Sequence, residues 1–163
     1  MTARWRRYLL WAEFALVIAL QLYAFSAAFA RHPPIVPAGR AFTCSPVRVW
    51  DGDGPIWCRE GPRLRLANIA AREIDNSCRQ GQPCPAASGP AARDQLVTLL
   101  GGARGRTRDG HVLVAGPPLS CRSLGPDKYG RTVARCRHGA QDIGAELIRR
   151  RVVLPWHLKT GPT

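Results

Sequence analysis

Three carboxylates and two arginines are spaced along the middle of the 163-residue chain in a way that suits hydrolysis of a phosphate ester. They are Asp51 and Asp53 in the turn-forming stretch DGDGP, Arg65, Glu73, and Arg131 after a second tight turn. A glutamate placed between arginines can remove a proton from attacking water. Guanidinium groups match phosphate bidentately and stay charged, so Arg65 and Arg131 can stabilise charge that accumulates on phosphate oxygens. Spacing alone leaves ordinary structural salt bridges as the alternative.

Short strands and turns are predicted for the segments that carry these residues. Residues 47–50 alternate apolar and polar side chains and, with residues 56–58, predict a hairpin around the acidic turn. Residues 64–69 predict a third strand with both faces partly apolar, as in a barrel wall. Further strands are predicted at residues 111–114, 119–122 and 132–136.

Two helices are predicted to cover this sheet. Ser88 can cap the first helix, Pro90 is tolerated in its first turn, and Gly101 ends it. The second helix begins near Asp142 and ends in three arginines. Strands followed by a helix, then more strands and a helix, predict an α+β fold built as a five-stranded barrel closed by helices.

Three segments of this domain resemble the signature segments of the staphylococcal-nuclease-like (thermonuclease) family. They are VRVWDGDG, RLRLANIAARE and DKYGRTVARC, and they occur in the family's order. The family is an OB-fold barrel with helices that hydrolyses DNA and RNA with calcium. The resemblance therefore implies an OB-fold-type barrel over residues 41–163 that acts on nucleic acid.

The resemblance also assigns roles to matching positions. It makes Arg65 and Arg131 the phosphate-stabilising arginines and Glu73 the general base. Tyr129 matches the tyrosine beside the nucleotide's phosphate, and we expect its neighbour Lys128 to contact substrate as well. All three catalytic side chains of the family pattern are present.

The implied metal site departs from the family pattern. Where the family has Ile-Asp-x-Pro-Glu this chain has IAARE, so the methyl group of Ala70 replaces a second carboxylate ligand. Asp53, more weakly Asp51, and the backbone carbonyl of Ala71 remain as expected ligands. Calcium takes six to eight oxygens and depends on carboxylate charge, so we expect a weakened calcium site, with magnesium or manganese as alternatives.

Four other residues bear on this weakened site. Gly54 stands where the family usually has threonine, and Arg72 replaces proline with a positive charge that either substitutes in part for the metal or repels it. Asn68 and Asp75 are candidates for the missing oxygen. In a continuous strand Asn68 would face the same side as Ala70.

An apolar segment over residues 8–30 follows three arginines near the N-terminus. It predicts a signal peptide or a membrane anchor over residues 1–30, and the tripeptide at 28–30 is of the kind a signal peptidase cuts. A proline-rich linker at residues 31–40 would join it to the domain. We therefore expect a periplasmic or secreted domain, or one anchored outside the cytosol through residues 8–30.

Six cysteines, all in the exported part, predict disulfides rather than a zinc site, because the chain has no Cys-x-x-Cys pair. Chain order suggests the pairs Cys44–Cys58, Cys78–Cys84 and Cys121–Cys136.

The formal net charge of the chain is +13, of which the first thirty residues contribute three arginines and one glutamate, a net +2. The remainder keeps +11, and a small domain with that excess attracts polyanions. The sequence thus favours an exported, monomeric nuclease of DNA or RNA with an altered metal site. A catalytically inactive OB-fold module that binds nucleic acid or an acidic envelope polymer is the alternative, and a structural envelope protein is a third.

Overall fold

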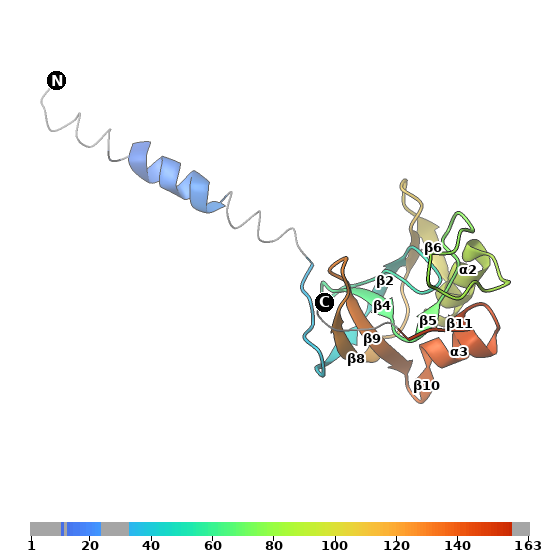
Figure 1. Ribbon diagram of the computed structural model, residues 1–163. Helices are drawn as coiled ribbons and strands as arrows, with labels where there is room; N and C mark the ends of the chain where they lie inside the picture. The colour runs from blue at the N-terminus through green and yellow to red at the C-terminus, as the bar shows by residue number, and fades with distance from the viewer. Residues whose placement is uncertain (1–10, 12, 24–32, 158–163) are drawn as a thin grey trace, which may run out of the picture. The chain divides into compact units, whose positions relative to one another are not determined.

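The computed structural model describes residues 11, 13–23 and 33–157 and divides into two compact units, Met1–Pro33 and Pro34–Thr163 (Figure 1). In the first unit residues 13–23 are helical. No helix in the described part of the chain combines the length and the apolar character that crossing a bilayer requires. Much of the predicted signal or anchor segment, including residues 28–30, lies outside the described residues.

The second unit is a mixed α+β domain in which one long sheet curls into a half-barrel (Figure 1). Its strand order is β1-β8-β9-β4-β3-β2-β7-β6, with β10 on the edge of β9, and a separate pair joins β11 to β5. The strands are β1 (Ala41–Cys44), β2 (Pro46–Val49), β3 (Ile56–Cys58), β4 (Arg63–Leu66), β5 (Ile69–Ala70), β6 (Ala103–Arg106), β7 (Val112–Val114), β8 (Leu119–Pro126), β9 (Thr132–His138), β10 (Gln141–Asp142) and β11 (Leu154–Pro155).

The sequence-based count of five strands was wrong, because short or exposed strands carry little pattern. β6 has all four residues exposed, so it lacks the alternation that marks a half-buried strand. The predicted strand at 64–69 is broken after Leu66, where Asn68 takes a φ of 62°. As a result β4 stays in the large sheet while β5 pairs with β11.

Both predicted helices are present, and the first begins at its predicted cap. Helix α2 (Gly89–Leu99) begins at Ser88, whose side chain accepts a hydrogen bond from the Ala91 N–H at 3.2 Å. Helix α3 (Ile143–Arg149) begins at Asp142, which accepts from the Ala145 N–H at 2.9 Å. A shared core holds both helices against the sheet, and its fully buried residues include Leu64, Leu66, Ile69, Ala92, Leu96, Leu100, Ile143 and Leu147.

The start of the domain is bonded to the sheet before β1 begins. Val36 donates its N–H to the Thr132 hydroxyl at 3.1 Å, and its carbonyl accepts from the Ser123 hydroxyl at 2.7 Å. Gly39 donates to the Ser123 carbonyl at 2.9 Å. The second half of the proline-rich stretch is therefore part of the folded unit.

All three predicted disulfides are present: Cys44–Cys58, Cys78–Cys84 and Cys121–Cys136. The first links β1 to β3, the second closes the loop between β5 and α2, and the third links β8 to β9. Disulfides are rare in a reducing cytosol, so this framework is consistent with an exported protein.

Removing one inter-strand disulfide should destabilise the domain substantially. The Cys44–Cys58 bridge closes a loop with a sequence separation of 14, for which the chain-entropy estimate gives about 3 kcal/mol. We expect the double variant Cys44→Ser/Cys58→Ser to lose about that much free energy of unfolding in urea titrations. A thermal midpoint of the unmodified chain that is the same with and without reductant would contradict this expectation.

Candidate functional site

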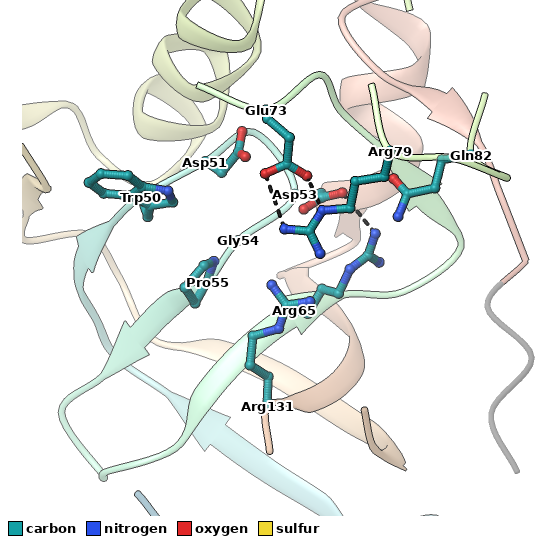
Figure 2. A pocket seen from close by; sticks show the side chains of 10 residues that line it. All are labelled: Trp50, Asp51, Asp53, Gly54, Pro55, Arg65, Glu73, Arg79, Gln82 and Arg131. Carbon is teal, nitrogen blue, oxygen red and sulfur yellow. Dashed lines mark hydrogen bonds and ion pairs between the residues drawn. The ribbon is translucent and has the colours of Figure 1, made fainter. Parts of the chain in front are cut away.

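One pocket gathers the side chains that the sequence singled out (Figure 2). The lining includes Asp51, Asp53, Arg65, Glu73 and Arg131, although they come from the β2–β3 turn, β4, the segment after β5, and the turn just before β9. The remaining lining residues are Trp50, Gly54, Pro55, Arg79 and Gln82. The fold thus brings the predicted catalytic residues together on one surface.

A buried ion pair between Asp53 and Arg65 forms the floor of this pocket. Arg65 Nη2 lies 2.8 Å from Asp53 Oδ2, and the arginine side chain is only 3% exposed. The guanidinium also donates to the carbonyls of Leu66 at 2.9 Å and Ile69 at 3.2 Å. Asp53 Oδ2 accepts a further bond from the Ala71 N–H at 3.3 Å. Burial raises the pKa of Asp53, and the charge of Arg65 opposes that shift.

The parallel pairing of β4 with β9 brings Arg131 close to Arg65. Arg131 Nε donates to Asp127 Oδ2 at 2.6 Å, and Asp127 Oδ1 accepts the backbone N–H groups of Tyr129 and Arg131, each at 2.9 Å. Burial lowers the pKa of Arg65, the Asp53 carboxylate opposes this shift, and the charge of Arg131 adds to it. Two guanidinium groups that repel each other at one pocket favour an anionic ligand between them.

Glu73 is held by a residue that sequence reasoning missed. Its carboxylate forms an ion pair with Arg79 Nε and accepts from Arg79 Nη2 at 3.2 Å (Figure 2). The Glu73 backbone is held in the loop, because its N–H donates to the Ser77 carbonyl at 3.0 Å and its carbonyl accepts from the Asn76 N–H at 2.9 Å. The paired side chains remain accessible, with 26% of Glu73 and 41% of Arg79 exposed.

Asp51 has the character of a neutral acid. Its burial, the nearby charge of Asp53 and the proximity of Glu73 raise the pKa of Asp51 to about 8, against an opposing hydrogen bond from the Gly52 N–H. At neutral pH this carboxyl group therefore retains its proton for most of the time.

The donors around the pocket do not match a calcium site. Ala70 is fully buried and pairs with Leu154 of β11, so the position of the second carboxylate offers only a methyl group. One oxygen of Asp53 already accepts two hydrogen bonds, and one oxygen of Asp51 accepts the Gly52 N–H. Within the described ranges no group of three or more His, Cys, Asp or Glu side chains is arranged to hold a metal. Calcium requires six to eight oxygens, so these residues do not fit it.

The two candidate replacement ligands point elsewhere. The positive φ of Asn68 breaks the strand, so the prediction that it faces the same side as Ala70 was wrong. Its amide instead lies against the Arg135 guanidinium, and when the amide is oriented with its oxygen toward that group the contacts are 2.8 and 3.1 Å. Asp75 accepts the Ser77 N–H at 2.9 Å in an exposed turn.

The other departures from the family pattern have structural explanations. Arg72 donates to the carbonyls of Pro85 at 2.7 Å and Asn76 at 2.9 Å, so its side chain tethers the loop before α2. Gly54 has a φ of 115°, and a Cβ there would lie 2.6 Å from the Leu64 carbonyl oxygen. Threonine would be strained in this turn.

Tyr129 and Lys128 lie beside the pocket and are not part of its lining. The Tyr129 ring is 52% exposed, and the cationic groups of Lys128, Arg131 and Arg79 lie 5.1, 5.3 and 5.4 Å from its centroid. An exposed aromatic ring among cations suits stacking of a nucleic-acid base.

Sequence reasoning missed several residues of the site. Arg79 and Gln82 belong to the Cys78–Cys84 loop, whose only signal in the sequence was its cysteine pair. Trp156, which no pattern in the sequence marks, has its ring centroid 5.3 Å from the Arg65 guanidinium carbon. An apolar residue near a chain end gives no indication of such a contact.

No protein-family model matches the chain, and a search of curated proteins finds no match to it.

Breaking the buried ion pair should destabilise the domain strongly. Asp53→Asn removes the negative partner of Arg65 and leaves a charge that is almost fully buried, which typically costs about 3 to 5 kcal/mol. We expect a loss of that size in urea unfolding at pH 7, whereas Asp75→Asn, at an exposed aspartate in the turn that holds Ser77, should change stability far less. Equal losses for the two variants would contradict the structural role of the pair.

Proposed function

We propose that the domain hydrolyses phosphodiester bonds of nucleic acid, which is the activity implied by its resemblance to the staphylococcal-nuclease-like family. The observation that carries this proposal is the convergence of Arg65, Glu73 and Arg131 on one pocket. In water attack on a phosphodiester, the two arginines can stabilise the charge on the phosphate oxygens, and the carboxylate can take a proton from the water.

The roles follow from the contacts of each group. Arg65 uses three of its five N–H donors on Asp53, Leu66 and Ile69 among the described residues, which leaves two for a phosphate. Arg131 would bind the same phosphate from the β9 side. Glu73 would take a proton from water as the water oxygen bonds to phosphorus. The bond to the leaving oxygen then breaks, and that oxygen takes a proton from solvent.

Charge and surface chemistry support nucleic acid as the substrate. The chain after residue 30 keeps a formal charge of +11, which favours a phosphate backbone at low salt. Tyr129 adds an exposed stacking surface next to the arginines of the pocket. The disulfide framework supports a site of action outside a reducing cytosol.

Binding without cleavage is a second candidate, and two observations favour it. Glu73 is already engaged by Arg79, and Ala70 stands where the family pattern has a carboxylate. In that case the same pocket would hold a phosphate of nucleic acid or of an acidic envelope polymer without activating water.

Glu73→Gln separates these two functions. For a nuclease we expect the substitution to lower the rate of single-stranded DNA and RNA cleavage by about 100-fold or more, because the proton acceptor is lost. Affinity for a fluorescent oligonucleotide should be retained. Cleavage is measured with calcium, magnesium, manganese or EDTA, and Arg59→Ala, in the exposed turn after β3, controls for loss of one charge. Salt-sensitive binding without cleavage under all four conditions would favour the binding module.

A further inference from the structure

The pocket contains a cation that the sequence pattern did not assign. We propose that the Arg79 guanidinium supplies, within this site, the positive charge that a metal ion would otherwise bring. In the free protein it pairs with Glu73, and it transfers to a phosphate oxygen when nucleic acid binds. This inference rests on the proposed function and identifies a further substrate-binding residue.

Arg79 lies where it can contact both Glu73 and a phosphate bound in the pocket. It contacts both oxygens of the Glu73 carboxylate, and its guanidinium carbon lies 5.4 Å from the centroid of the Tyr129 ring. Its hydrogen bond to Glu73 raises its pKa, and the charge of Asp53 contributes to the same shift. A positive charge therefore lies on the Glu73 carboxylate and close enough to Asp53, an expected metal ligand, to interact with its charge.

The loop that carries Arg79 is held in place from several sides. The Cys78–Cys84 disulfide begins at the residue before Arg79. Arg72 donates to the carbonyls of Asn76 and Pro85, one on each side of that disulfide. The Asn76 side chain accepts the Gly89 N–H at 3.0 Å, which joins the loop to the start of α2. A pre-ordered loop presents the guanidinium to a ligand without further ordering.

The exposure of the Arg79–Glu73 pair makes an exchange of partners feasible. The Arg65–Asp53 pair is 3% and 12% exposed, whereas the Arg79–Glu73 pair is 41% and 26% exposed. An exposed ion pair is weak, and a phosphate can offer arginine two charge-assisted hydrogen bonds. Moving Arg79 from Glu73 to phosphate would leave the Glu73 carboxylate free to accept a proton from water.

Arg79→Ala and Arg79→Lys in the purified chain test this inference, with Arg59→Ala as the control for net charge. In EDTA we expect Arg79→Ala to lose about tenfold or more in oligonucleotide affinity, because it lacks a charged hydrogen bond to phosphate. Arg79→Lys should keep part of that affinity, and Arg59→Ala nearly all of it. Thermal unfolding of each variant confirms that the fold is intact.

Metal dependence provides the second readout. We expect the unmodified chain to bind oligonucleotide in EDTA, and to cleave it there if it is a nuclease, with no gain on adding millimolar calcium. An absolute requirement for a divalent metal, or equal oligonucleotide affinity of Arg79→Ala and the unmodified chain, would overturn the role of Arg79. Absence of cleavage by the unmodified chain under every condition would overturn the proposed hydrolysis. The affinity measurements alone would then decide whether Arg79 binds phosphate.

Discussion

The buried Arg65 guanidinium is the constraint from which the rest of the site follows. A charge that is removed from water must be paired and hydrogen-bonded, and Asp53 together with the carbonyls of Leu66 and Ile69 meets that requirement. These bonds fix the turn after β2 against β4 and bring the chain at β5 back over the guanidinium. The acidic turn, the break in the strand and the floor of the pocket are therefore parts of one arrangement.

The pocket contains two kinds of ion pair, one buried and one exposed to solvent. Arg65 and Asp53 are too deeply buried to exchange partners, so they serve to shape the pocket. Arg79 and Glu73 stand at its opening and are solvated, so they can respond to an anionic ligand. Ala70, where the family pattern has a carboxylate, is buried and pairs with β11, and the positive charge of Arg79 comes from the loop between β5 and α2. We propose that such a site binds phosphate, and that hydrolysis depends on whether Glu73 is released.

Local sequence patterns predicted the helices, whose ends carry clear capping residues. They did not predict which strands pair across long sequence separations. Ser88 and Asp142 marked both helix starts because capping is a local interaction. Chain order gave the disulfide pairs, since the paired cysteines are only 14, 6 and 15 residues apart in the sequence. β1 and β6 carried too little alternation, and the break at Asn68 depends on contacts with Arg135 and β9. The predicted site residues do converge, but Arg79 comes from an irregular loop whose placement no periodicity encodes.

The most direct test of the account is a crystal structure of the chain with a short single-stranded oligonucleotide, grown in EDTA. The account predicts one phosphate group within hydrogen-bond distance of both Arg65 and Arg131, with Arg79 on a phosphate oxygen and no longer on Glu73. An oligonucleotide bound on another face, with the Arg79–Glu73 pair intact and the pocket filled only by water, would contradict it.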